Sequence, residues 1–181
     1  MIAIDHYPGR LALAKGLGAE TLDFTKTRVR KALTEMSGGL GPDAVIDAVG
    51  MSHGWAPDAI MDTIKQNVGI SADSALALRQ AMVAVRKGGR VSIPGVYGGV
   101  LDKFPLGAVM EKGLQIRTGQ THVHTYLKEL LHRIGEGEID TTFMISHRLP
   151  LEDAVRGNQN FLYNQNEWTK VVLKPGTEVR A

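Results

Sequence analysis

The sequence predicts an α/β protein built on a parallel sheet, and three observations lead to that prediction. Short apolar stretches alternate along the chain with segments whose apolar residues recur at helical spacing. Residues 43–50 are nearly continuously apolar, which is typical of a strand buried on both faces of a parallel sheet. Glycines directly follow several helical segments, where they act as stop signals. This alternation is the pattern that successive βαβ units produce.

The first 120 residues carry most of these elements. Residues 1–5 form an apolar strand that ends in Asp5, and a helix begins at about Pro8 and stops at Gly16. The remaining strands of this part are expected at residues 21–24, 43–50, 90–95 and 114–117. Further helices are expected at residues 29–36 and 73–87, with Asp73 as the N-cap of the second.

Beyond residue 120 the rhythm changes. Helices are expected at residues 126–134 and 151–161, and strands at residues 143–149 and 169–173. Periodicity alone leaves open whether this tail extends the first sheet or belongs to a second unit.

Composition excludes several classes of function. The 181 residues are enough for one domain with a core and a small appendage, and 43% hydrophobic with 22% charged residues is ordinary for a globular protein. The net charge of +2 is spread along the chain, so neither nucleic acid nor a membrane is an expected partner. No apolar run approaches the length of a transmembrane helix, and no secretory signal is visible. The absence of cysteine excludes disulfides and thiolate metal ligands, and a cytoplasmic location is the default expectation.

Asp5 is the most informative residue. A strand that ends in an acid, followed at once by a helix, is how a dinucleotide-binding fold holds the ribose hydroxyls of adenosine. An acid there repels a 2′-phosphate, which favours NAD over NADP. The glycine-rich phosphate loop normally comes about 20 residues earlier, yet this sequence begins at the strand itself. We therefore expect a cofactor-binding fold that starts one βα unit late.

Two other predicted strands end in small residues. Val49 is followed by Gly50, and Gly95 lies between Pro94 and Val96. Such ends let the main chain approach a flat ring closely, although each glycine taken alone is equally compatible with a tight turn. Taken together and in this order, they favour a dinucleotide site.

The histidines do not define a metal site. His122 and His124 would lie on one side of an extended segment, a spacing compatible with a metal pair. A third protein ligand is usually needed, and only the distant His132 or His147 or an acid would supply it. A polar loop that faces the cofactor is the favoured interpretation of this segment.

No catalytic set can be assembled either. Asp43 and Asp47 flank a strand without a partner that would support a two-carboxylate mechanism. Ser52 and Ser92 lack the G-x-S-x-G setting of a hydrolase nucleophile. From its residues alone, the chain is better suited to binding than to catalysis.

An ordered set of short motifs resembles the zinc-type medium-chain dehydrogenase/reductase superfamily, which includes the alcohol dehydrogenases. The set comprises residues 3–5 with Arg10 and Leu11, PDAVIDAVG at 42–50, GGRVSIPG at 88–95 and SHRLPLEDA at 146–154. A second set is similar to the glutathione-independent formaldehyde dehydrogenase branch: GVYGG at 95–99, DKFP at 102–105, TGQTHV at 118–123 and the long segment 50–73. The resemblance covers essentially the whole chain.

The resemblance implies roles for nine residues. Asp5 would hold the adenosine ribose, and Arg10 would lie against the adenine. Four residues would line the ribose and the nicotinamide, namely Val49, His53, Pro94 and Val96. Three would close over the cofactor, namely Gly119, Gln120 and Thr121. Read without the resemblance, His53 is as well explained by a solvated position.

The same resemblance implies an incomplete protein. Family members carry a preceding catalytic barrel with zinc, and this chain has neither its ligands nor the glycine-rich loop. We expect residues 1–120 to form a partial NAD-binding Rossmann domain that lacks its first βα unit. Residues 121–181 would form a helix and strand segment that returns toward the absent barrel. No catalytic residue and no metal ligand are expected, and NAD binding should be weakened because the helix that holds the pyrophosphate is missing.

Three readings of function follow. The leading one is the cofactor-binding C-terminal portion of a zinc-dependent, NAD-linked alcohol or formaldehyde dehydrogenase, inactive alone. The second is a non-catalytic module that forms homo-oligomers through exposed sheet edges. The third is one chain of a split dehydrogenase, whose partner chain would carry the catalytic domain.

Overall fold

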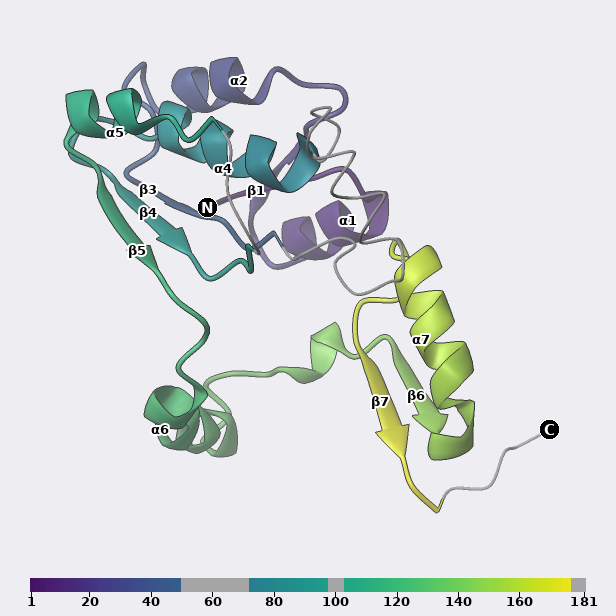
Figure 1. Ribbon diagram of the computed structural model, residues 1–181. Coiled ribbons are helices and arrows are strands. Elements are labelled where there is room, and N and C mark those ends of the chain that lie inside the picture. The colour runs from purple at the N-terminus through teal and green to yellow at the C-terminus, as the bar shows by residue number, and fades with distance from the viewer. Residues whose placement is uncertain (50–71, 98–102, 177–181) are drawn as a thin grey trace. The chain divides into compact units, whose positions relative to one another are not determined.

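A computed structural model describes residues 1–49, 72–97 and 103–176. The chain divides into two compact units, one of Met1–Thr27 with His124–Ala181 and one of Arg28–Val123. Helices alternate with short strands through most of the chain, as Figure 1 shows. Every strand pairing within these described ranges is parallel, in the orders β1-β2, β3-β4-β5 and β6-β7. The predicted α/β class with a partial parallel sheet is thus confirmed, while the expected domain boundary near residue 120 stays a prediction.

The first unit begins with a βαβ element. Strand β1 (Ile2–Asp5), helix α1 (Pro8–Gly16) and strand β2 (Glu20–Asp23) follow one another. Pro8 suits the first turn of α1 because the missing N–H has no partner there in any helix. The two strands pair so that Asp5 lies beside Asp23, which places both acids at the carboxyl edge of this sheet.

The same unit contains the C-terminal segment. Its elements are helix α6 (Val123–Gly135), a 3-10 turn η1 (Thr142–Met144), strand β6 (His147–Pro150), a 3-10 turn η2 (Leu151–Asp153), helix α7 (Ala154–Tyr163) and strand β7 (Val171–Lys174). Helix α7 packs on β6 and β7, where Gly157 allows a close approach, since a Cβ there would lie 3.0 Å from Leu149 Cδ1.

The predicted strand 143–149 is wrong in its first half. Asp140 accepts hydrogen bonds from the backbone N–H of Thr142 at 2.7 Å and from its hydroxyl at 2.6 Å. These bonds start the turn η1, so the strand begins only at His147. Local side-chain bonding of this kind competes with extended structure.

The second unit holds the main core. Its elements are α2 (Val29–Met36), β3 (Ala44–Ile46), α4 (Ala72–Ala84), β4 (Arg90–Ile93), α5 (Leu106–Lys112) and β5 (Gln115–Thr118). Five buried side chains form one cluster between α4 and β4, namely Leu78, Met82, Val85, Val91 and Ile93. Helix α5 was not predicted from the sequence.

Helix α4 ends earlier than the predicted residue 87. The ammonium group of Lys112 donates to the carbonyl oxygens of Val83 at 2.5 Å and of Val85 at 2.8 Å. The Val83 carbonyl is one that a helix through residue 87 would have used. Burial lowers the pKa of Lys112. Helix α4 begins at Ala72, so Asp73 lies inside it rather than at its N-cap.

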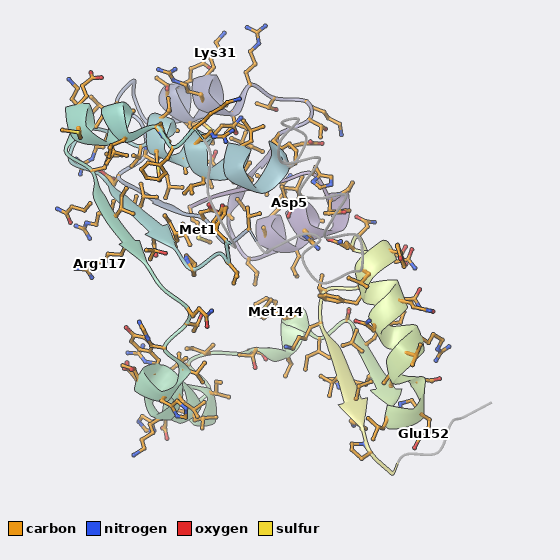
Figure 2. All side chains as sticks on the ribbon, in the orientation of Figure 1. Met1, Asp5, Lys31, Arg117, Met144 and Glu152 are labelled. Atoms are coloured by element: carbon orange, nitrogen blue, oxygen red, sulfur yellow. The ribbon has the colours of Figure 1, made fainter. Side chains whose placement is uncertain are left out.

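The prediction that strand 43–50 is buried on both faces is also wrong. Val45 faces the core cluster, but Ala44 is exposed and Ile46 is 70% exposed. Strand β3 is short, and within this unit α4 packs on the side of the sheet that carries Val91. The opposite side carries a groove lined by residues such as Ile46, Ser92 and Arg117, the last labelled in Figure 2.

Candidate functional site

Asp5 lies at the carboxyl end of β1, next to the start of α1 (Figure 2). One carboxylate oxygen, Oδ1, accepts the backbone N–H of His6 at 2.6 Å and that of Tyr7 at 3.0 Å. The other, Oδ2, lies 3.6 Å from a guanidinium nitrogen of Arg10. The side chain keeps 28% of its surface exposed. Asp5 is therefore fixed in orientation and still accessible, which suits an acceptor of ligand hydroxyls.

Arg10 is held by three groups of the first unit. Its guanidinium lies over the Tyr7 ring at 4.6 Å, near Asp5, and donates to Gln165 Oε1 at 2.8 Å. The neighbouring residues of both segments form a second hydrogen bond, which the Gly9 N–H donates to Asn166 Oδ1 at 2.7 Å. The loop after α7 therefore fixes the start of α1, and Arg10 lies beside Asp5. The cofactor roles expected of both residues stay predictions.

The second unit holds the ends of β3 and β4 together. The Asp47 N–H donates to the Ser92 carbonyl at 2.8 Å, and the Gly95 N–H donates to the Asp47 carbonyl at 3.1 Å. Val49 is half-buried, and Val96 is 44% exposed. These residues lie at the carboxyl edge of parallel strands, where α/β sheets bind ligands.

The other expected cofactor residues have simpler surroundings. Pro94 is exposed at the end of β4. Gly119, Gln120 and Thr121 form an exposed loop between β5 and α6. His53 and Gly50 lie outside the described residues.

The histidine pair does not occupy an extended segment. Helix α6 begins at Val123, so His122 precedes the helix and His124 lies within it. Within residues 1–49, 72–97 and 103–176, no three His, Asp or Glu side chains form a group suited to a metal ion. His132 lies exposed in α6, and His147 stacks on Trp168 with ring centroids 3.6 Å apart.

The sequence did not reveal the contacts of three residues of these two sites, namely Asp47, Tyr97 and Gln165. Asp47 is 4% exposed and accepts a hydrogen bond from the Tyr97 hydroxyl at 2.5 Å. Gln165 binds Arg10 from a loop 155 positions along the chain. The sequence carried two signals for the contact between Asp47 and Tyr97: an acid inside an apolar strand, and a tyrosine in GVYGG. No local pattern marks the contact between Gln165 and Arg10, because it depends on how distant segments pack.

Among the described residues, none of the helices has the length and apolar character needed to cross a bilayer.

Comparison with known proteins identifies the family. No model of a protein family matches the chain. The uncharacterized zinc-type alcohol dehydrogenase-like protein AdhB of Bacillus subtilis is 37% identical over 177 residues, covering 97% of this chain and 46% of that protein. The L-threonine 3-dehydrogenase of Bacillus velezensis is 30% identical over 176 residues, covering 96% of this chain and 43% of that protein.

A solved structure agrees with these relatives. The alcohol dehydrogenase TADH from Thermus sp. ATN1 is 31% identical and superposes with a TM-score of 0.73, over 96% of this chain and 43% of that one. This chain thus spans a little under half the length of the proteins it matches. It belongs to the zinc-type medium-chain dehydrogenase/reductase superfamily, whose members include alcohol dehydrogenases.

Proposed function

We propose that this chain supplies the NAD-binding part of a zinc-dependent alcohol or formaldehyde dehydrogenase and has no activity alone. The observation that carries the proposal is Asp5, oriented at the end of β1 with an accessible carboxylate beside Arg10. One relative in the solved structures is an NAD-dependent alcohol dehydrogenase, 27% identical over 97% of this chain with a TM-score of 0.69. The formaldehyde substrate rests on the GVYGG, DKFP and TGQTHV motifs alone.

The residues present fit part of the cofactor. Asp5 would accept the adenosine ribose hydroxyls, and Arg10 would lie along the adenine ring. Val49, Pro94 and Val96 would contact the nicotinamide end, with Gly119, Gln120 and Thr121 covering it. Bound NAD would accept a hydride at nicotinamide C4. The 181 residues contain no G-x-G-x-x-G loop, so these residues alone would bind the pyrophosphate without a helix N-terminus and the NAD affinity should be low.

The residues present do not fit zinc. The chain has no cysteine, and the described residues contain no three-ligand His, Asp or Glu group. The parent reaction would need zinc to polarise the substrate oxygen. In the proposed enzyme, those ligands would come from another polypeptide segment. This chain matches less than half of the length of its relatives.

Replacing Asp5 by alanine is expected to weaken NAD binding about tenfold or more, because a charge-assisted hydrogen bond contributes about 1.5–3 kcal/mol. Isothermal titration calorimetry of the full chain with NAD measures the change. The matched control is Glu20→Ala, which removes the same charge from the exposed opposite end of the same strand pair. Equal affinity in wild type and Asp5→Ala would contradict the ribose role, and so would equal losses in both variants.

The isolated chain is expected to show no dehydrogenase activity, since it has no cysteine and its described residues contain no group of three His, Asp or Glu ligands. Purified chain is incubated with zinc, NAD and either ethanol or formaldehyde, and NADH is followed by absorbance. A full-length zinc-type alcohol dehydrogenase under the same conditions is the positive control. Turnover that tracks the chain through purification would overturn this part of the proposal.

A second function is favoured by helix α6. Six apolar side chains of this helix are exposed, namely Val123, Tyr126, Leu127, Leu130, Leu131 and Ile134. A 13-residue helix is marginally stable in water without a packed face. In the described part of the chain, each of the three short sheets ends in strands that pair on one side only, and such edges expose backbone groups. These features favour a non-catalytic module that forms homo-oligomers.

One pair of measurements separates the candidates. NAD binding by a monomer supports the cofactor role, whereas a tight oligomer in light scattering without NAD binding supports the module. A partner chain that carries the zinc ligands and the glycine-rich loop would make this chain half of a split dehydrogenase. Mixing the two chains would then produce NADH where each alone does not.

A further inference from the structure

A buried carboxyl lies where β3 ends. Asp47 is 4% exposed, and removing a carboxylate from water is costly unless its oxygens are hydrogen-bonded. Both oxygens have partners: Oδ1 accepts the N–H of Val49 at 3.1 Å, and Oδ2 accepts the hydroxyl of Tyr97 at 2.5 Å. The first bond fixes the turn after β3 locally. The second reaches a residue 50 positions later, beyond the end of β4.

Tyr97 is held in its protonated, donating form. Burial is the largest cause that raises the pKa of Tyr97 above its ordinary value, and the hydrogen bond to Asp47 raises it further. The phenol therefore stays a donor throughout the neutral and mildly alkaline range. A neutral donor that faces a carboxylate makes a stronger bond than a pair of neutral groups.

The main chain draws the same two segments together. The Gly95 N–H donates to the Asp47 carbonyl at 3.1 Å. A Cβ at Gly95 would lie 2.6 Å from the Val49 carbonyl oxygen and 3.1 Å from that of Asp47, so only glycine fits this approach. The spacing between the two strand ends is thus set by one backbone bond, one glycine and one side-chain pair.

We propose that Asp47 and Tyr97 are a positioning pair that holds the ends of β3 and β4 at the spacing required by the nicotinamide half of NAD. This inference rests on the function proposed above, in which Val49, Pro94 and Val96 contact that half. In this role neither Asp47 nor Tyr97 would touch the reacting atoms. Their contribution is preorganisation. Because the strand ends are already fixed, less of the binding free energy of NAD is lost in ordering them.

Removing the phenolic oxygen tests this role with little change in shape. Tyr97→Phe keeps the ring and leaves one Asp47 oxygen without its donor, so NAD is expected to bind roughly tenfold more weakly. Asp47→Asn keeps the volume and weakens both bonds of the carboxyl, with a loss at least as large. The matched control is Tyr163→Phe, a tyrosine that is 83% exposed.

Two measurements on the full chain separate positioning from simple stabilisation. Calorimetry gives the NAD affinity, and amide hydrogen exchange followed by NMR reports the Val49 and Gly95 N–H groups, with the urea midpoint recorded for each variant. We expect Tyr97→Phe and Asp47→Asn to accelerate exchange at Val49 and Gly95 by tenfold or more. Amides in the middle of β4, such as Val91, should keep their wild-type rates.

Each result decides between the alternatives. Lower urea midpoints with unchanged NAD affinity and unchanged exchange at Val49 and Gly95 would overturn the proposal, because the pair would then only stabilise the fold. Faster exchange with unchanged affinity would also overturn it, since the strand ends would not form the cofactor wall. If the wild type binds no NAD, the proposed function fails, and with it the cofactor role of the pair. Exchange would then show whether the pair holds the strand ends.

Discussion

Replacing Met82 by alanine is expected to lower the free energy of unfolding by about 2–5 kcal/mol, the usual range for a buried methionine. Met82 is 0% exposed and lies in the cluster that joins α4 to β4, with Val85 and Val91 as fully buried neighbours. Truncating the Met82 side chain would leave a cavity in the cluster between α4 and β4. Urea denaturation of the full chain, followed by circular dichroism, measures the loss.

The control for this prediction is Met110→Ala. Met110 lies in α5 of the same unit and is 74% exposed, so its truncation should change the stability by no more than about 0.5 kcal/mol. Similar losses for Met82→Ala and Met110→Ala would mean that the cluster is not the core of this unit.

Gly41→Ala is expected to cost about 3–5 kcal/mol, near the upper end for single substitutions. Gly41 has φ +91°, a left-handed conformation that costs a side chain about 1–2 kcal/mol by itself. An added Cβ would also press on the Ala84 carbonyl oxygen and lie 3.2 Å from the Arg86 nitrogen. That backbone ends helix α4 and is tied to the same segment by the bond from the Arg86 N–H to the Pro42 carbonyl.

Gly39→Ala separates the two costs. Gly39 has φ +93°, almost the same conformation, and an added Cβ there would have no heavy atom within 4 Å. Its replacement should therefore cost only the conformational part, about 1–2 kcal/mol. Urea midpoints of the two variants give the difference directly. Equal losses would refute the close contact between residue 41 and the end of α4.

Much of the first half of the chain was predictable because its signals are local. The strand that ends at Asp5, the proline that starts α1 and the apolar spacing of Val29 and Leu33 each act within a few residues. The errors arose where side chains bind backbone groups that a longer helix or strand would have used. Lys112 binds the carbonyls of Val83 and Val85 at the end of α4, and Asp140 binds the N–H of Thr142 where the longer strand was expected.

The candidate site divides in the same way. Asp5 was identified from the sequence because the end of a strand and a following helix start are local features. Gln165 was missed because it reaches Arg10 across 155 positions. Asp47 was noticed, but its partner Tyr97 is specified by the crossing of two strand ends and not by any spacing.

The sequence by itself determined the fold class and the superfamily, and it singled out Asp5 as the residue proposed to hold a ribose. These depend on periodicity, on turn residues and on short motifs, all of which act between near neighbours. Only the tertiary structure decided which side chains share a site. It showed that one face of β3 is exposed and the other is partly buried, that Arg10 is bound by Gln165, and that Asp47 is buried and hydrogen-bonded to Tyr97. The physical reason is that burial and hydrogen-bond partners depend on segments far apart in the chain, and their meeting is a property of the packed molecule.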